Sequence, residues 1–432
     1  MMTLSRRRFL HVSAGTLAAG ALTGCATNPV TGKSEFLLLS PAQEVNIDRE
    51  NAPHQFSADY GAVQDKALAA YIAGVGTAMT PITHRPEMPY SFTCVNATYI
   101  NAYAFPGGTV GITRGILLKM ENEAELGALI GHELGHVASR HTAQRMSRSM
   151  LANLAVAGLS IAIQDGRTRE LVGGLGAIGA GVLLASYSRD QEREADSLGL
   201  EYSTRSGYSP EGFIDLMSML NDLSGSSDRS QIDLLFSTHP MSRERYDTAV
   251  AEVRTGRYDR TRPIHRERYM DNIKSLRTMA PAIEAMQHGD REMAAKKLDA
   301  AQEQYARAVK LAPTDYTARM LLAKCYYAQK KSTEATVQVK RAVELYPNEP
   351  QGHNLLGFIA MNNKQYEQAL ESFSTYEKLL PGNPNTIFFQ GYSYEGMNRR
   401  TEAAQKYRDY LQKGGSGEYG QHAQNRLAQW RL

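Results

Sequence analysis

Apolar residues of this chain fall mostly at helical spacing, with one short stretch of β-forming sequence. Around residue 130, acidic residues in a first turn precede apolar positions spaced as on a buried helix, namely Leu126, Leu129, Ile130 and Leu134. Upstream, residues 90–95, 98–105 and 109–113 are rich in β-branched and aromatic side chains, and Gly107-Gly108 marks a turn. The pattern predicts an α+β fold, mainly α, with a small β-sheet beside that helix.

The last third of the chain repeats itself every 34 residues. Turns that end in proline recur at Leu311-Ala312-Pro313, Leu345-Tyr346-Pro347 and Leu379-Leu380-Pro381. Thirty-four residues is the tetratricopeptide period, with two antiparallel helices per repeat. We therefore expect an α-helical tetratricopeptide repeat array, closed by a final helix over about 418–430, whose concave face binds protein segments. The alternative is that the repeats only stabilise the rest of the chain.

Five residues on the predicted helix have the pattern of a metal-dependent hydrolase. They are His132-Glu133-Leu134-Gly135-His136, the H-E-x-x-H arrangement. Residues four apart share a helix face and lie roughly 6 Å apart along the axis, so both imidazoles can reach one ion. Zinc accepts neutral imidazole and keeps one position for water in hydrolytic sites. We therefore expect one Zn²⁺ per chain, with Glu133 as the base that takes a proton from the water.

The version of this motif with a third histidine soon after the second is excluded by the sequence. Ser139 and Thr142 occupy the positions where its glycine and third histidine would stand. His141 lies about 140° from the ligand face by helical geometry. We expect His141 to be a solvated helix residue.

A second helix, over 190–202, offers the missing ligand. On it Glu192 and Asp196 share a face, while Glu194 points roughly the opposite way. Glu192 is therefore the expected third metal ligand. Asp196 is placed to accept the outer N–H of a zinc-bound histidine, which fixes the orientation of the ligand.

Four segments lie in the same order as in a known peptidase family. They are Asn101-Ala102-Tyr103-Ala104-Phe105-Pro106-Gly107-Gly108, the His132–His136 motif, Glu192-Arg193-Glu194-Ala195-Asp196, and Thr238-His239-Pro240 followed by Arg245. The chain resembles the HtpX-like and CAAX-prenyl-protease-like zinc metallopeptidases, and most of all the periplasmic BepA-type members with tetratricopeptide repeats. The resemblance implies a gluzincin-type metallopeptidase domain, with zinc on His132, His136 and Glu192 and with Glu133 as the base.

Two further segments of that resemblance have expected roles in catalysis. Asn101, Ala102, Tyr103, Ala104 and Phe105 form an expected edge strand that pairs with an extended, unfolded or flexible substrate through its backbone; the alternative is a purely structural hairpin. His239 and Arg245 are expected beside the zinc, where donors would stabilise the developing oxyanion. His239 could instead take the fourth zinc position and hold the enzyme idle, and the plainest alternative is a capping histidine with a surface arginine. We expect the helix that carries Arg245 to begin at Pro240.

The N-terminus has the pattern of an exported lipoprotein. Ser5-Arg6-Arg7-Arg8-Phe9-Leu10 resembles a twin-arginine export signal, and a short apolar run follows it. Leu22-Thr23-Gly24-Cys25 resembles the lipoprotein processing box, so Cys25 is the expected lipidation site. Ala26 replaces the aspartate that retains lipoproteins at the inner membrane, which favours the outer membrane. We expect a periplasmic protein held to the membrane by the lipid on Cys25.

Domain boundaries follow from a change of composition between about residues 255 and 280. We expect a signal peptide over 1–24, a zinc metallopeptidase domain over 25–265 and the repeat domain over 266–432. The apolar segment 151–185 is interrupted by the polar run 164–170, and its longest uncharged piece is shorter than the roughly 20 residues of a membrane span. We expect two helices there, packed over or beside the zinc cleft.

Charge and cysteine content narrow the function further. Without the three leader arginines, 45 basic and 45 acidic residues remain, so we expect no nucleic-acid partner. Cys94 and Cys325 are expected to be buried thiols. The sequence therefore predicts an endopeptidase that removes misfolded or stalled envelope or outer-membrane proteins, with the repeats recruiting substrates or the outer-membrane protein assembly machinery. The alternative is a chaperone or assembly factor that acts mainly by binding through the repeats.

Overall fold

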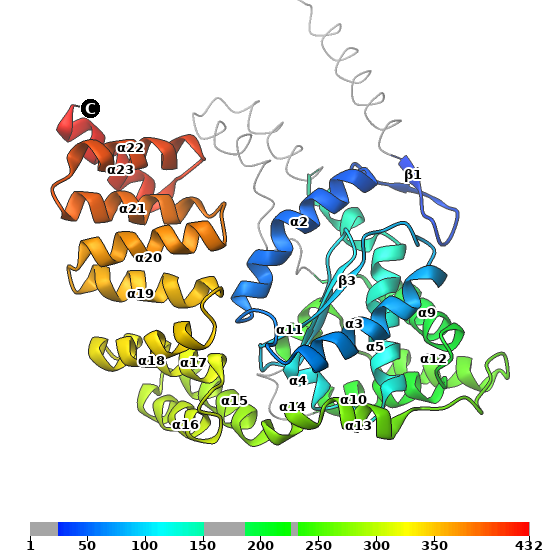
Figure 1. Cartoon of the computed structure of the whole chain (residues 1–432). Helices are drawn as coiled ribbons and strands as arrows, with labels where there is room; N and C mark the ends of the chain where they lie inside the picture. The colour runs from blue at the N-terminus through cyan, green and yellow to red at the C-terminus, as the bar shows by residue number, and fades with distance from the viewer. Residues whose placement is uncertain (1–24, 151–185, 226–231, 432) are drawn as a thin grey trace, which may run out of the picture.

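The chain folds into an α/β body and an array of paired helices beside it (Figure 1). The computed structural model describes residues 25–150, 186–225 and 232–431. The α+β, mainly α fold class expected from the sequence is confirmed. The expected signal peptide over 1–24 and the two helices expected within 151–185 lie outside the described residues.

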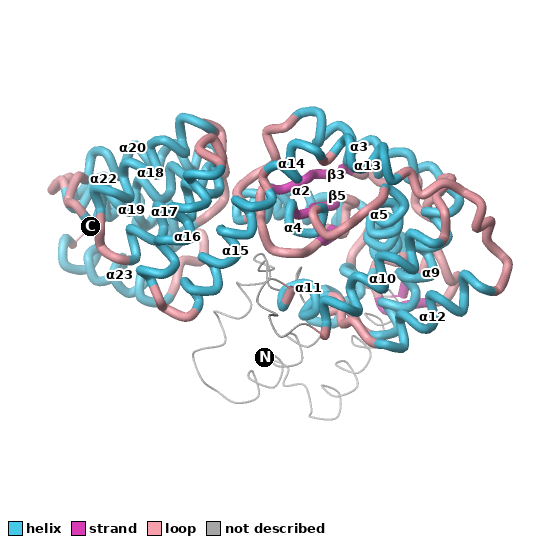
Figure 2. Tube along the Cα trace, turned by 90° about the horizontal axis from the view of Figure 1, so that it is seen from below, coloured by secondary structure: helices cyan, strands magenta, loops and turns pink. Residues whose placement is uncertain are grey.

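The body begins with a β-hairpin and two helices and then forms a three-stranded sheet. The first elements are β1 (Cys25–Thr27), β2 (Ser34–Phe36), α2 (Pro41–Ala58), α3 (Lys66–Met79) and the 3-10 helix η1 (Thr80–Ile82). The sheet consists of β3 (Ser91–Val95), β4 (Ala102–Ala104) and β5 (Thr109–Thr113), in the order β3-β5-β4. β5 pairs in parallel with β3 and antiparallel with β4, so β4 lies at one edge of this sheet. Figure 2 shows the strands enclosed among the helices of the body.

Further helices of the described residues complete the body. They are α4 (Arg114–Leu117), α5 (Glu123–Ala138), α9 (Arg189–Arg205), α10 (Glu211–Ser224), α11 (Asp233–Thr238) and α12 (Arg243–Arg254). α5 begins where Asn122 accepts the backbone N–H of Glu125 at 3.0 Å, and α9 begins at a capping box formed by Ser188 and Gln191. These caps start both helices about one to four turns before the residues that form the metal centre.

α5 and α9 pack closely because small residues face each other between them. A Cβ at Gly199 would lie 2.9 Å from the His132 backbone nitrogen, and one at Gly131 would lie 2.8 Å from the Gly199 carbonyl oxygen. Neither backbone could keep its place beside a larger side chain. The glycines therefore let the two helices approach until residues on both can reach one point.

The array confirms the helix pairs that the 34-residue period predicts. Its helices are α15 (Ala280–Ala294), α16 (Leu298–Leu311), α17 (Tyr316–Ala328), α18 (Ser332–Leu345), α19 (Pro350–Asn362), α20 (Tyr366–Leu379), α21 (Pro384–Gly396), α22 (Arg400–Gln412) and α23 (Gly417–Trp430). The period also recurs in the backbone, because left-handed residues stand in the turns at Lys296, Lys330, Lys364 and Asn398. Each pair therefore turns with the same geometry.

Two short helices join the body to the array, and the apolar core continues through them. They are α13 (Arg266–Asn272) and α14 (Lys274–Thr278). Tyr269 is fully buried and its hydroxyl donates to the Leu117 carbonyl at 2.7 Å, and Ile273 is also fully buried. The start of the predicted repeat domain at residue 266 therefore packs as part of the body. The boundary between the domains stays a prediction.

Polar contacts hold the first repeats against the body. Arg114, which follows β5, lies 2.6 Å from the Asp315 carboxylate at the start of α17, and both side chains are buried. Ser57 in α2 donates to Glu349 at the start of α19 at 2.6 Å. The array is thus tied to the sheet and to α2.

The described residues contain no helix suited to span a membrane, and they contain two buried thiols. Among the residues that the structure describes, no helix combines the length and the apolar character of a membrane span. Cys94 and Cys325 are free and buried, as expected.

Candidate metal centre

The facing surfaces of α5 and α9 bring three predicted ligands to one point. His132 Nε2 lies 3.1 Å from His136 Nε2, and the Glu192 carboxylate lies 3.8 Å from the first and 3.4 Å from the second. All three side chains are buried. Ligand atoms at 2.0–2.1 Å around one tetrahedral zinc are about 3.3 Å apart. The donor set and its spacing therefore fit a metal ion of this kind.

His239 joins the same cluster from the end of α11. Its Nδ1 lies 3.4 Å from His132 Nε2 and 3.2 Å from Glu192 Oε1. One ligand atom from each of His132, His136, Glu192 and His239 lies within 4.8 Å of the others. The structure thus places His239 where a fourth ligand would lie. The following helix, α12, begins at Arg243 and not at Pro240 as expected, because Ser242 caps it by accepting the Arg245 N–H.

Positive charge and hydrogen bonds within the cluster keep Glu192 ionised, and burial makes Glu133 more basic. Burial alone would raise the pKa of Glu192, but the charges and hydrogen bonds of His239, His136 and Arg245 hold it well below its usual value. Burial raises the pKa of Glu133, which makes its carboxylate a better proton acceptor than an exposed one. Glu133 Oε1 lies 3.9 Å from His239 Nε2, beside the cluster and outside the set of ligand atoms.

Arg245 and Asp196 form a clamp behind His132. Asp196 Oδ1 lies 3.0 Å from the outer Nδ1 of His132, the contact that the helix spacing predicts. Arg245 donates twice to Asp196 at 2.7 Å, and its Nη1 also lies 2.6 Å from Glu192. Arg245 thus holds both the ligand Glu192 and Asp196 behind His132. Its expected role as an oxyanion donor stays a prediction.

The prediction that His141 is a solvated helix residue is wrong. His141 is 1% exposed, where a solvated side chain was expected, and its Nδ1 lies 2.9 Å from the outer Nδ1 of His136. The angular argument assumed that the helix continues, but α5 ends at Ala138 and Arg140 takes a left-handed φ of 58°. The chain therefore folds His141 back onto the ligand.

Tyr187 also belongs to the centre and was missed. Its ring stacks on His136 with centroids 3.7 Å apart and planes 17° apart. Its backbone N–H donates to the Thr238 carbonyl at 2.9 Å, next to His239. No periodic or motif signal marks Tyr187, since it lies just before the capped start of α9.

The expected substrate strand lies beside the zinc helix but its side chains face inward. Residues 101–105, which include β4, are all buried, and β4 packs against α5. The Tyr103 hydroxyl donates to Asp59 at 2.5 Å. Asn101 bonds β5 through its backbone, and its buried carboxamide has no partner among the described residues. The outer edge of β4 is the part relevant to substrate pairing, and that role stays a prediction.

An apolar hollow borders the cluster on the side of Glu133. Its volume is about 20 Å³, room for about one water. Apolar residues of α5, α10 and α11 form most of its wall, and the polar residues at its rim are His132, Glu133, His239 and Arg245. His239 and α11 therefore close the cluster from this side.

Sequence comparisons assign both parts of the chain. The family model described as "Peptidase family M48" matches residues 66–253, and a tetratricopeptide repeat model matches residues 292–359. The chain is 32% identical to the metalloprotease YcaL of Escherichia coli (strain K12) over 205 residues, 46% of this chain and 72% of that protein. The chain belongs to peptidase family M48. The expectation of a metallopeptidase of this kind, with tetratricopeptide repeats, is confirmed.

Two further relatives share the name "Beta-barrel assembly-enhancing protease". The one from Yersinia pestis is 30% identical over 243 residues, which cover 55% of this chain and 49% of the relative. The one from Escherichia coli (strain K12) is 28% identical over 238 residues, 54% and 48% of the two chains. The chain thus spans about half the length of these curated relatives.

Proposed function

We propose that this chain is a zinc-dependent endopeptidase of the bacterial periplasm that degrades misfolded or stalled envelope proteins. The observation that carries the proposal is the convergence of His132, His136 and Glu192 with Glu133 beside them. Bound zinc would act as a Lewis acid on the attacked carbonyl. The Glu133 carboxylate takes a proton from the attacking water and returns it to the leaving amine.

His239 supports a protease that is restrained at rest. Its Nδ1 lies among the ligand atoms, where it would occupy the position that a catalytic site keeps open. Of the two roles left open by the sequence, this placement favours the inhibitory ligand. It is also compatible with the chaperone alternative, because an enzyme that is restrained most of the time can still bind proteins through its repeats.

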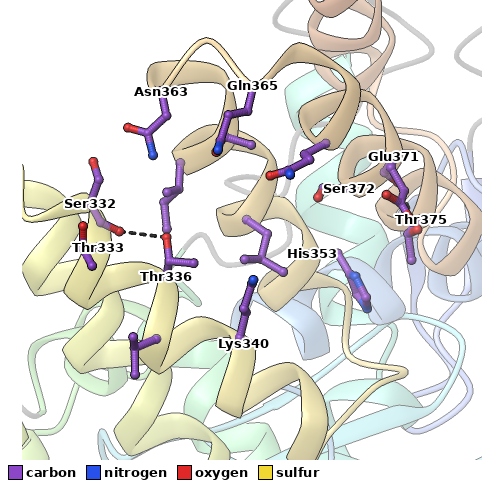
Figure 3. A pocket seen from close by; sticks show the side chains of 15 residues that line it. Ser332, Thr333, Thr336, Lys340, His353, Asn363, Gln365, Glu371, Ser372 and Thr375 are labelled. Atoms are coloured by element: carbon purple, nitrogen blue, oxygen red, sulfur yellow. Dashed lines mark hydrogen bonds between the residues drawn. The ribbon is translucent and has the colours of Figure 1, made fainter.

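The repeats supply a surface for substrates or partners. Polar side chains of α18, α19 and α20 surround a groove of about 710 Å³, among them Lys340, His353 and Glu371 (Figure 3). Relatives named for β-barrel assembly support a partner among outer-membrane proteins or their assembly machinery. Pairing at the β4 edge would admit only unfolded or flexible segments.

The N-terminus supports a lipid anchor. Cys25, in its processing-box context, would carry the lipid, and the outer membrane is favoured because Ala26 stands where inner-membrane lipoproteins carry aspartate. A Cys25→Ser protein should be released from the membrane fraction into the periplasmic extract. Continued sedimentation of Cys25→Ser with membranes would contradict the anchor without touching the enzymatic proposal.

Zinc content and hydrolysis together test the enzymatic proposal. Purified protein should hold about one zinc per chain, and His132→Ala, His136→Ala and Glu192→Ala should lose most of it. Glu133→Gln should keep zinc, because it is not a ligand, and lose hydrolysis of a flexible substrate such as casein. Full zinc in Glu192→Ala, measured by elemental analysis, would contradict the ligand set.

The same variant identifies substrates. Glu133→Gln protein should hold what the active enzyme would cut, so pull-down from envelope extracts should enrich outer-membrane proteins over wild type. Equal recovery by the wild type and Glu133→Gln would favour the binding-only alternative.

A further inference from the structure

The imidazole of His136 is held by groups that no catalytic step uses. We infer that His141 is a positioning residue for zinc, a neutral hydrogen-bond acceptor that fixes the tautomer and plane of His136. The inference rests on the proposed zinc site. It concerns how the protein retains the metal, and not the hydrolysis itself.

The two ring nitrogens of His136 point in different directions and make different contacts. Nε2 points into the cluster, 3.1 Å from His132 Nε2 and 3.4 Å from Glu192. Nδ1 points away from it and meets His141 Nδ1 at 2.9 Å. A neutral imidazole that binds metal through Nε2 carries its proton on Nδ1. His136 must therefore donate at this contact, and His141 must accept.

Acceptance at Nδ1 places the proton of neutral His141 on Nε2. That atom is buried and lies 3.6 Å from Glu194 Oε2, beyond hydrogen-bond distance but close enough for the carboxylate to attract its N–H. Glu194 is itself held by the Ser139 hydroxyl at 2.6 Å and by the Asn28 amide at 3.4 Å. The hydrogen bond from His136 to His141 and the nearby Glu194 carboxylate both favour a proton on His141 Nε2. That tautomer of His141 leaves its Nδ1 free to accept from His136, so that His136 Nε2 stays free for metal.

Tyr187 fixes the remaining freedom of the ring. It stacks on one face of His136 at 3.7 Å, and the Arg145 guanidinium lies 3.9 Å from the Tyr187 ring centroid. Two groups this close to one centroid must lie on opposite faces of the tyrosine, so the three side chains form a stack. The Tyr187 hydroxyl is held 3.0 Å from Thr142 Oγ1. The ring plane of His136 is therefore set by packing, and its tautomer by His141.

His132 shows the same design with a different acceptor. Its outer Nδ1 meets the Asp196 carboxylate, and Arg245 balances that charge. The cluster already contains the carboxylates of Glu133 and Glu192. A neutral acceptor behind His136 orients the ligand without a further anion in contact with it.

The test compares two replacements of His141 in full-length protein. His141→Leu removes the acceptor, and His141→Asn keeps an acceptor oxygen near the position of Nδ1. We expect zinc affinity to fall about 10- to 100-fold in His141→Leu, as for other groups that orient a ligand, and to stay within about threefold of wild type in His141→Asn. Zinc affinity is measured by competition with a chelating dye. Melting temperatures of the zinc-free proteins report folding separately.

His84→Leu is the matched control. His84 Nδ1 lies 2.6 Å from the Tyr202 hydroxyl in the same body, outside the metal cluster. It should keep wild-type zinc affinity. Unchanged affinity in His141→Leu, or equal losses in His141→Leu, His141→Asn and His84→Leu, would overturn the inference. Wild-type protein that binds no zinc would overturn the proposed function as well, whereas normal wild-type binding with an unaffected His141→Leu overturns the inference alone.

Discussion

His239 is held by a different kind of element from the other residues of the metal centre. His132, His136 and Glu192 stand inside long helices, whereas His239 is the residue that ends the short helix α11, with φ −120° and ψ 82°. A residue at the end of a short element can move at a lower free-energy cost than one inside a packed helix. If His239 is the fourth zinc ligand, its release is therefore the least costly way to open that position.

Replacing His239 should activate the enzyme. In His239→Ala the cluster keeps its three other ligands, so we expect zinc content to stay near one per chain and turnover of a flexible substrate to rise several-fold. Initial rates on casein at equal zinc content measure this. A fall in turnover of one to three orders of magnitude would instead assign His239 to the transition state as a donor.

At the residue scale, the sequence predicted what lies on a continuous helix and missed what depends on a chain reversal. His132, His136, Glu192 and Asp196 were found because their spacing on α5 and α9 is regular. His141 was misplaced because the helix ends three residues before it. Tyr187 and the clamp made by Arg245 depend on contacts between distant segments, which one sequence does not reveal.

At the scale of elements, the α5–α9 contact should tolerate no added atom. Gly199→Ala would place a Cβ 2.9 Å from the His132 backbone, so the helices must separate. We expect a loss of about 1–3 kcal/mol in the free energy of unfolding and weaker zinc retention, since Glu192 would move away from His132 and His136. Urea unfolding and elemental analysis measure the two effects.

Gly74→Ala is the control for that prediction. Gly74 lies within α3, and a Cβ there meets nothing within 4 Å. It should leave zinc unchanged and add up to about 1 kcal/mol of stability through helix propensity. If Gly199→Ala behaves like Gly74→Ala, the close approach of α5 and α9 is not what holds the ligands together.

The type of an element, helix or strand, was predictable wherever a regular hydrophobic or β-forming pattern ran through the whole segment. The repeats, the zinc helix and the three strands follow from local pattern alone. Strand order was not available from the pattern, because the pairing of β3 with β5 joins segments separated by β4. The start of α12 was set by the cap at Ser242 and not by Pro240, a choice between two valid start signals.

At the scale of the molecule, the attachment of the array contains a group that titrates near neutrality. Glu349 is 4% exposed, and burial raises its pKa to about 7. An acid whose folded pKa is raised binds a proton on folding between its two pKa values. The free energy of unfolding therefore falls as pH rises from about 4.5 to about 7, by up to about 3 kcal/mol.

Replacing Glu349 with an uncharged acceptor should remove that loss. Glu349→Gln can still accept from Ser57 and from the Gln351 backbone, so we expect a higher melting temperature than wild type at pH 7.5 and a similar one at pH 5. Glu344→Gln, at an exposed glutamate 62% accessible in α18, should show no such difference. A Glu349→Gln protein with the same pH dependence as wild type would contradict the assignment.

The position of β1 has a consequence for where such an enzyme can work. Cys25 is already the first residue of a strand that pairs with β2, and Asn28 next to that strand contacts Glu194 behind the centre. A lipid on Cys25 would be attached directly to the folded body, with no flexible linker between the two. The metal centre would then stay close to the bilayer surface, where it would meet chains held at the membrane more often than chains elsewhere in the periplasm.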